Sequence, residues 1–402
     1  MTSRCLPGCL FLVGAAAAAA ADLPALRMRP QTIDAKIQIG YGLAIADVDG
    51  DGKDDILLAD AKQIVWYRNP SWEKFVMAES LTAKDNVCIA ARDLDGDGKA
   101  EVAVGAEWNP SDTVNSGAVF LLEAPADRTQ RWSAKKLPHE PTTHRMHWMP
   151  GNGGKFSLAV LPLHGRGNKA ATGEGEGVKF HAYAWPWREG ATTTVFDTDA
   201  GLHLTHNFEM VRRADGPLMM VATKEGVQFL EPRDKTWHRH LVTTRPAGEV
   251  RSGSAPKLFV AAIEPMHGNE LVVYREPAPS AGDWSATRMV LDSSLVQGHG
   301  LAVGDLLGIG RDQIVAGWRG PGGAAQASAK VGIKVFAAED AAGEKWKQHA
   351  LLDDNQMACE DLKVADLNGD GRPEVVAAGR ATKNVIIYWN ETGSARGKSS
   401  LQ

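Results

Sequence analysis

The sequence predicts an all-β protein, a seven-bladed β-propeller whose blades have four strands each. Three observations support this prediction: a short Asp/Gly block recurs along the chain, strand-like segments flank every copy, and two further strand-like segments follow. Repetition of a four-strand unit is typical of propeller blades. The composition agrees, because 44% hydrophobic residues, 23% charged residues and 42 glycines in a chain of 402 suit many short strands and turns.

The chain opens with a predicted secretory signal peptide, residues 1–21. Arg4 lies in a short basic region, an apolar stretch runs through Leu10–Val13, and the small residues Ala15–Ala21 precede Asp22. A membrane anchor is the alternative, but the segment is short, rich in alanine and followed by no stop-transfer pattern. We therefore expect an exported protein, secreted or periplasmic, without a membrane span.

The Asp/Gly block marks the first two strands of a blade. Copies at 43–57, 91–102 and 364–375 are nearly intact, and a worn copy lies at 303–314. Alternating apolar residues on both sides of each block predict a hairpin. Third strands are expected at 64–67, 118–121, 270–274, 332–336 and 385–389. Fourth strands are expected to open at Trp72, Trp132, Trp237, Trp284 and Trp346.

Seven innermost strands can be aligned by their first residues. The aligned positions are Tyr41, Val87, His144, His206, Glu249–Ser252, His299 and Glu360. The last blade has only three strands of its own, so we expect residues 29–37 to supply the fourth and close the ring. The propeller is placed at 22–391, and residues 392–402 are predicted to be a disordered tail.

The repeated block reads Asp-x-Asp-Gly-Asp-Gly-x-x-Asp/Glu, with Asn368 in place of one aspartate. It resembles the FG-GAP/VCBS repeat of integrin-α-like propellers. A narrower resemblance, to the propeller part of aldos-2-ulose dehydratase-type proteins, rests on Thr143-His144-Arg145, Thr205-His206-Asn207, Gly298-His299-Gly300 and Cys359-Glu360-Asp361. This resemblance implies a carbohydrate lyase or dehydratase that acts on a keto-sugar or an oxidised glycoside.

The intact blocks are predicted calcium sites. Calcium takes six to eight oxygen ligands, which a nine-residue turn with acidic side chains at its first, third, fifth and ninth positions can supply. An EF-hand is excluded, because its twelfth position needs a glutamate and holds Leu58, Val104 or Ala377 here. A metal-free Asp/Gly turn is the alternative, and a structural role is favoured over a catalytic one. The candidate ligands are Asp47, Asp49, Asp51 and Asp55; Asp93, Asp95, Asp97 and Glu101; and Asp366, Asn368, Asp370 and Glu374.

The degenerate copy of the block in blade six, residues 303–314, predicts a turn that binds no ion. Its third, fifth and ninth positions are Leu307, Ile309 and Gln313, while Gly308 and Gly310 keep the tight backbone. The turn is therefore expected to survive without the calcium ligands.

A second candidate site lies at the opposite end of the ring, where the loops before first strands and after second strands emerge. His144, His206 and His299 precede first strands, and His164 and His267 follow second strands. Equivalent positions face one another across a propeller axis, so these imidazoles could bind one zinc or other divalent transition-metal ion. Taken singly, a histidine in a loop is more often a solvated or hydrogen-bonded residue than a metal ligand, and the convergence of several favours the metal site.

The catalytic candidates at the same end are Tyr41, Glu360, Arg319 and Arg380. A metal would polarise the substrate carbonyl, a base would take the adjacent proton, and the arginines would hold the forming enolate. Tyr41, Glu360 and an unliganded histidine are the alternatives for the base. The competing hypothesis is a non-catalytic extracellular propeller that binds carbohydrate or protein and carries structural calcium.

The net charge and the number of cysteines argue against several further functions and against a disulfide-stabilised fold. The formal net charge of −5 comes without a basic cluster, so we expect no nucleic-acid partner and no anionic membrane surface. After removal of the signal peptide only Cys88 and Cys359 remain, and they are expected to be buried thiols rather than a disulfide framework. The sequence leaves the oligomeric state open.

Overall fold

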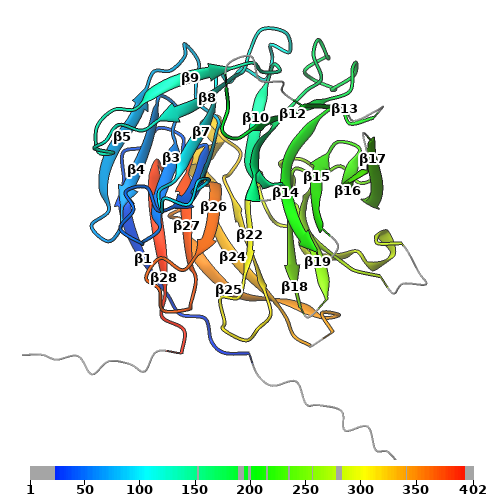
Figure 1. Ribbon diagram of the computed structural model, residues 1–402. Coiled ribbons are helices and arrows are strands. Elements are labelled where there is room, and N and C mark those ends of the chain that lie inside the picture. Colours follow the sequence, from blue (N-terminus) through cyan, green and yellow to red (C-terminus); the bar gives the residue numbers. More distant parts are fainter. Residues whose placement is uncertain are drawn as a thin grey trace, which may run out of the picture.

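The computed structural model describes residues 23–151, 154–188, 194–197, 201–213, 216–233, 236–255, 257–277, 283–340 and 342–393. Within these residues, 28 strands form seven sheets of four strands, which confirms the predicted seven-bladed propeller. Figure 1 shows the sheets arranged around a central axis. The predicted signal peptide and residues 394–402 of the predicted tail lie outside the described residues.

In each of the first six blades the strands follow the order of the chain, and the first strands of neighbouring blades contact one another around the axis. Blade one contains β2 (Gly42–Ala46), β3 (Asp55–Ala59), β4 (Gln63–Arg68) and β5 (Glu73–Glu79). Blade two contains β6 (Cys88–Arg92), β7 (Glu101–Ala106), β8 (Ala118–Glu123) and β9 (Ser133–Leu137). Blade three contains β10 (Thr143–Pro150), β11 (Phe156–Pro162), β12 (Lys179–Ala184) and β13 (Thr194–Asp197).

The next three blades repeat this arrangement. Blade four contains β14 (Thr205–Arg213), β15 (Gly216–Thr223), β16 (Gly226–Arg233) and β17 (Thr236–Thr243). Blade five contains β18 (Glu249–Ser254), β19 (Leu258–Glu264), β20 (Glu270–Arg275) and β21 (Met289–Asp292). Blade six contains β22 (Gly298–Gly304), β23 (Gln313–Trp318), β24 (Gly332–Ala338) and β25 (Trp346–Asp354).

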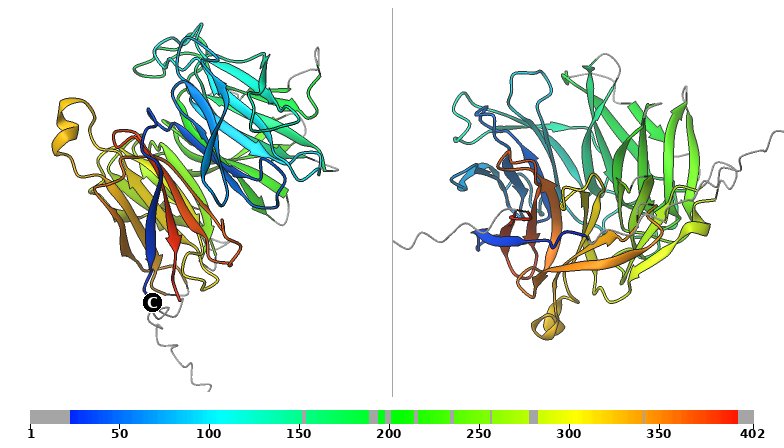
Figure 2. Two further views of the ribbon diagram at one scale, coloured as in Figure 1. Left: turned by 90° about the vertical axis from the view of Figure 1, so that its left-hand side faces the viewer. Right: turned by 90° about the horizontal axis from the view of Figure 1, so that it is seen from below.

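The N-terminal strand closes the ring. Blade seven contains β26 (Cys359–Ala365), β27 (Glu374–Gly379) and β28 (Asn384–Asn390), and β1 (Met28–Asp34) pairs antiparallel with β28. Figures 1 and 2 show the blue β1 alongside the red β28. The predicted closure is confirmed, and it covers the edge that β28 would otherwise expose.

The two cysteines are buried, unpaired thiols, as expected. A Cβ atom placed on Gly105 would lie 2.5 Å from Cys88 Sγ, and one on Gly317 would lie 2.5 Å from Cys359 Sγ. These glycines therefore allow the close approach of neighbouring blades. Burial raises the pKa of Cys88 to about 12, which keeps the thiol protonated at neutral pH. Among the described residues, no helix has the length and apolar character needed to cross a bilayer.

Four innermost strands carry a β-bulge among their first residues. The register slips between Thr143 and Arg145 in β10, and between Thr205 and Asn207 in β14. The same slip occurs near the start of β22 and of β26. A bulge adds one residue to a strand and re-aims its side chain. The residues skipped by the pairing are His144, His206, His299 and Glu360.

Candidate functional site

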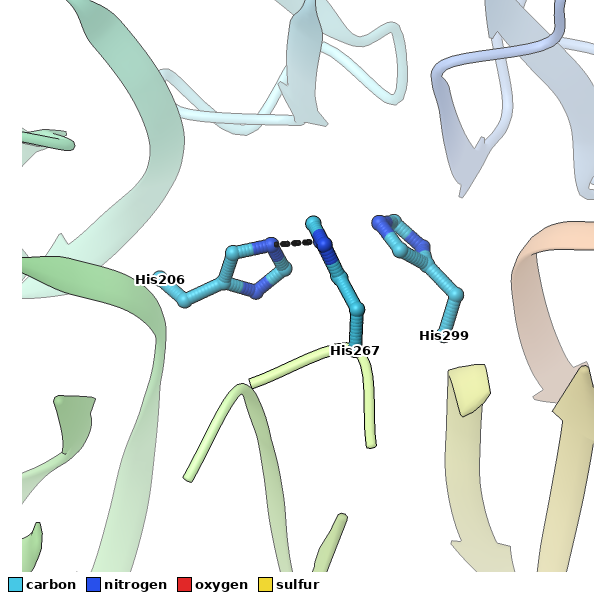
Figure 3. A group of neighbouring side chains, drawn as sticks. All are labelled: His206, His267 and His299. Atoms are coloured by element: carbon cyan, nitrogen blue, oxygen red, sulfur yellow. Dashed lines mark hydrogen bonds between the residues drawn. The ribbon is translucent and has the colours of Figure 1, made fainter. Parts of the chain in front are cut away.

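Three of the five predicted histidines meet near the axis. His206, His267 and His299 come from neighbouring blades, and one ring nitrogen of each lies within 4.8 Å of the others (Figure 3). His206 and His299 occupy bulges, whereas His267 lies in the turn after β19. The φ of His267 is 51°, in the left-handed region that non-glycine residues seldom adopt. Such a conformation persists where the surrounding structure imposes it, often at functional sites.

Hydrogen bonds at Nδ1 orient two of these imidazoles. His206 Nδ1 donates to the Gly248 carbonyl oxygen at 3.2 Å and lies 3.0 Å from Glu249 Oε1, and His299 Nδ1 donates to the Glu360 carbonyl oxygen. Because Nδ1 carries the proton, each ring presents the lone pair of Nε2 to the cluster. Burial lowers the pKa of both histidines, so both are neutral at neutral pH.

His267 completes the cluster through its Nε2, which lies 2.8 Å from Nε2 of His206 (dashed in Figure 3). Its Nδ1 lies 3.4 Å from Arg319 Nη2, and a guanidinium can only donate. The Nε2–H of His267 therefore donates to His206. Burial, followed by the charges of His206 and Arg319, lowers the pKa of His267 to about 2, so this ring is also neutral.

The cluster fits a divalent transition metal. It offers three neutral imidazoles, two of which already have their Nδ1 atoms bonded to oxygen acceptors, as in most protein zinc sites. A tetrahedral ion would hold two nitrogens about 3.3 Å apart, so His206 and His267 would have to separate by about half an ångström. For His267 to bind the ion as a neutral imidazole, the proton on its Nε2 would have to move to Nδ1, and Arg319 Nη2 would have to turn away from that atom.

The other two predicted histidines lie beside the cluster or away from it. His144 Nε2 lies 3.0 Å from Arg145 Nη1, and its ring stacks on Trp108 with a centroid separation of 4.9 Å. His144 also contacts His206 edge-on, at 4.7 Å between centroids. His164 lies in a β-bridge with Leu204, and its buried Nδ1 has no hydrogen-bond partner among the described residues, so it does not join the cluster. The structure therefore places His267, rather than His144, with His206 and His299.

The predicted catalytic residues form one group next to the histidines. Arg319 Nη1 lies 2.9 and 3.1 Å from the two carboxylate oxygens of Glu360, and Arg380 Nη1 lies 2.9 Å from Oε1. The Glu360 side chain is 3% exposed, whereas that of Arg380 is 40% exposed and so can reach a ligand. Arg380 also lies over the ring of Tyr41, 5.5 Å from its centroid.

Tyr41 is arranged as a proton donor. Its hydroxyl donates to Asp85 Oδ2 at 3.2 Å. Burial raises the pKa of Tyr41 to about 12, although the Arg380 charge opposes this shift. At neutral pH the phenol therefore keeps its proton.

The alignment of the blades did not predict that Glu249 lies beside the histidine cluster. Its carboxylate accepts a hydrogen bond from Asn207 Nδ2, its Oε1 lies 3.0 Å from His206 Nδ1, and Arg145 Nη2 lies 3.9 Å away. Burial opposes its ionisation, but the His206 bond and the Arg145 charge outweigh this effect and lower its pKa to about 2. Glu249 occupies the blade-five position aligned with His206 and His299, which is the signal that could have singled it out.

The Asp/Gly loops at the opposite end gather their first, third and ninth side chains. Oxygens of Asp47, Asp49 and Asp55 lie within 4.8 Å of one another, and the second loop repeats this arrangement with Asp93, Asp95 and Glu101. Among the described residues, Asp49 Oδ1 is buried and has no hydrogen-bond partner.

The fifth side chains of these loops make local contacts. Asp51 accepts hydrogen bonds from the backbone and the ammonium of Lys53, at 2.9 and 2.8 Å. Asp97 and Asp370 likewise accept the backbone N–H of the residue two positions on. In the third loop, Asn368 Nδ2 lies 3.4 Å from Glu374 Oε1, and Asp366 accepts the N–H groups of Gly369 and Gly371.

The ninth side chain also supports the turn itself. Asp55, Glu101 and Glu374 each accept a backbone N–H from the residue after the first aspartate, at 2.8 Å. In blade six Gln313 accepts the N–H of Leu307 at 2.9 Å. A glutamine thus keeps a closely similar hydrogen bond without the charge. Burial raises the pKa of both Asp55 and Glu101 to about 7 in these ion-free loops.

Comparison with known families agrees with the repeated loops. A model of the FG-GAP-like repeat matches residues 47–104, and a model of the FG-GAP repeat matches residues 89–122. The chain is a seven-bladed β-propeller with FG-GAP repeats within residues 47–122. Over an alignment of 284 residues, this propeller is 25% identical to aldos-2-ulose dehydratase of Phanerodontia chrysosporium. The match covers 63% of this chain and 30% of that protein, so the chain spans less than a third of the relative.

Solved structures share the propeller fold with low sequence identity. A chain of the mitotic checkpoint complex is 10% identical, with a TM-score of 0.55 over 96% of this chain and 99% of that chain. The extracellular domain of a two-component system protein from B. thetaiotaomicron is 11% identical, with a TM-score of 0.53 over 90% of this chain and 39% of that chain. These similarities concern the fold alone.

Proposed function

We propose that this protein is an exported carbohydrate lyase, a metal-dependent dehydratase of a keto-sugar or oxidised glycoside. The observation that carries the proposal is the cluster of His206, His267 and His299, flanked by Tyr41 and by the pair of Glu360 and Arg319. The similarity to aldos-2-ulose dehydratase supports the same reaction class.

The proposed reaction is a β-elimination of water. A divalent transition metal, zinc or a related ion, held by the three imidazoles would polarise the substrate carbonyl and acidify the adjacent C–H. The C–H proton goes to a base, a C=C bond forms, and the β-oxygen leaves as water after it receives a proton. No oxidant or reductant is needed.

The residues of the chain divide the proton transfers and the charge stabilisation. Tyr41, protonated at neutral pH, is placed to give its proton to the leaving oxygen. Arg380, partly exposed and anchored on Glu360, can hold the negative oxygen of the enolate. The candidates for the base are Glu360 and a histidine that holds no metal, which are distinguished by solvent exchange of the substrate C–H in a Glu360→Gln variant.

The proposal includes calcium on the opposite face. The three Asp/Gly loops gather carboxylates that repel one another without an ion, so calcium there would stabilise the hairpins rather than take part in the reaction. Export rests on the signal-peptide pattern of residues 1–21.

Turnover of keto-sugars tests the proposed function. Protein loaded with calcium and zinc is expected to convert 1,5-anhydrofructose or a 3-keto-glycoside to an unsaturated ketone, which is followed by ultraviolet absorbance and mass loss of one water. A Tyr41→Phe variant should lose roughly 10²-fold or more in turnover, because it lacks the proton donor. Binding of these sugars without any elimination would contradict the lyase and support the non-catalytic binding propeller.

Metal content tests the assignment of the ligands. We expect His267→Ala to lower zinc affinity at least tenfold, because one of three protein ligands is gone. His144→Ala is the matched control and should keep zinc, since Nε2 of His144 is bonded to Arg145. Zinc per chain is measured by mass spectrometry after dialysis at limiting metal. Equal losses in both variants would refute the assignment of His267 as ligand and His144 as neighbour.

A further inference from the structure

A cavity of about 320 Å³ lies among the innermost strands. It is lined by residues of β2, β6, β10, β14, β18 and β26, so six of the seven blades contribute to its wall. Tyr41 lines it, as do Arg145 and Asn207, which directly follow His144 and His206 in the chain. The cavity therefore adjoins the histidine cluster, and its volume is at the lower end of the range for small-ligand sites.

The wall of this cavity carries a positive charge. Its ionised side chains are Arg92, Arg145, Arg251 and Lys363 against a single carboxylate, Asp361. Lys363 donates to both oxygens of Asp361, at 2.8 and 2.9 Å, so these two charges offset each other. Three arginines remain.

The arginines have few anionic partners. Arg251 Nη1 donates to the Val250 carbonyl oxygen at 2.6 Å, and within the described part of the chain no carboxylate lies within 4.0 Å of Arg251 or Arg92. Arg145 has Glu249 at 3.9 Å. The nearby carboxylate of Glu209 accepts two bonds from Ser252, and burial raises its pKa, which weakens its opposing charge.

The positive charges of the cavity wall lower the pKa of a histidine in the same wall. His147 lines the wall, and its pKa is lowered to about 3 by burial and then by the charges of Arg251 and Lys363. A neutral imidazole adds no charge of its own, so Glu249 and Glu209 are the carboxylates that oppose the three arginines. Guanidinium groups bind carboxylates through paired, charge-assisted hydrogen bonds.

We propose that this axial cavity binds the carboxylate of a sugar acid, so that the site takes an acidic keto-sugar in preference to a neutral one. The inference rests on the proposed carbohydrate function. A ligand whose reactive carbon lies at the histidines would place its carboxylate further into the cavity. There it would contact Arg145 and Arg251, which lie one or two positions further along the innermost strands than the aligned first residues. Specificity then comes from charge recognition in the channel, because a neutral sugar leaves the guanidiniums without a partner.

Calorimetric binding to the full, calcium-loaded chain tests this proposal with D-glucuronate, D-glucose and glucose 6-phosphate. Glucuronate differs from glucose by a carboxylate in place of a hydroxymethyl group, and we expect it to bind at least about tenfold more tightly. Added salt should weaken the binding, since the interaction is between charges.

Variants locate the binding within the cavity. Arg251→Gln should weaken glucuronate binding about tenfold, and Arg251→Lys should restore part of it because the charge is kept. Arg131→Gln removes the same charge from an exposed ion pair with Glu79 on the outside of the ring and should change nothing.

The outcomes separate this inference from the proposed function. Equal binding of glucuronate and glucose, tighter binding of glucose 6-phosphate than glucuronate, or an unchanged affinity in Arg251→Gln would overturn the sugar-acid site. Turnover of neutral keto-sugars could persist in each case. Glucuronate binding that depends on Arg251 would support the site even in a protein that turns over no keto-sugar.

Discussion

Glu249→Gln is expected to lower the turnover of a keto-sugar by about 10²-fold while the protein stays folded. The carboxylate accepts a hydrogen bond from Asn207 Nδ2, and its Oε1 lies 3.0 Å from His206 Nδ1. A glutamine amide can accept only through its oxygen, so its NH₂ group would face one of these two donors. The imidazole then loses the negative charge beside its Nδ1–H, and the Gly248 carbonyl oxygen alone still directs its Nε2 lone pair into the cluster.

Glu249 acts through His206, so it is a positioning residue, and its role has a specific signature. Zinc affinity should fall about 10- to 100-fold in Glu249→Gln, and saturating zinc should restore part of kcat with little change in KM. Turnover, zinc affinity and thermal unfolding are measured together. No loss of turnover in the folded variant, or a loss that excess zinc never relieves, would contradict this role.

Asp34→Asn is the matched control for a carboxylate with little exposure. Asp34 accepts hydrogen bonds from Tyr67 and Lys74 at 2.8 Å and lies on β1, in the strand that closes the ring. Its side chain is 9% exposed. The substitution is expected to lower the unfolding temperature but to leave turnover within about twofold, since Asp34 supports the fold alone.

The fold could be predicted from the sequence because its information is local and repeated. Each Asp/Gly block fixes a hairpin, and the spacing of the blocks fixes a blade. The closure by β1 followed from the missing strand in the last blade. The same repetition identified His144, His206, His299 and Glu360 as equivalent positions, which the structure explains by a bulge at each of them.

Contacts between residues far apart in the sequence decide which histidines belong to the cluster. His164 and His267 lie in similar phrases, Pro-Leu-His-Gly and Pro-Met-His-Gly. His164 is in a bridge with Leu204, forty positions along the chain, whereas the turn of His267 takes a φ of 51° and brings its ring to the axis. Alignment of first residues also overlooked His147 and Lys363, which lie deeper on the innermost strands and line the cavity.

In the predicted calcium loops, the sequence likewise predicted the turn correctly but not every side-chain contact within it. Spacing alone placed four side chains around an ion, and the ion-free structure gathers the first, third and ninth. Asp51 bonds to Lys53 instead, a local contact that competes for the carboxylate when no ion is present. Calcium would have to draw Asp51 away from Lys53 to complete the predicted ligand set.

Glu101→Gln is expected to remove calcium from the second loop without unfolding it. Calcium per chain should fall from three ions to two, because one charged ligand of that loop is lost. The hairpin should persist, since Gln313 in blade six also accepts a backbone N–H of its loop, that of Leu307, at 2.9 Å. Stoichiometry is measured by equilibrium dialysis, and Gln130→Glu, a charge change on an exposed side chain, is a control that should keep all three ions.

The stability of the ion-free proteins should depend on pH in a defined direction. Burial raises the pKa of Glu101 from 4.5 to about 7, so the folded chain holds this proton more tightly than the unfolded chain. Raising the pH through this interval removes the proton and lowers the stability of the wild type, whereas the glutamine has no proton to lose. In a calcium chelator, Glu101→Gln should therefore unfold at a higher temperature than the wild type at pH 8 and at a similar temperature at pH 5. Asp55 titrates in both proteins and cancels in the comparison, so a difference that is the same at both pH values would refute the role assigned to Glu101.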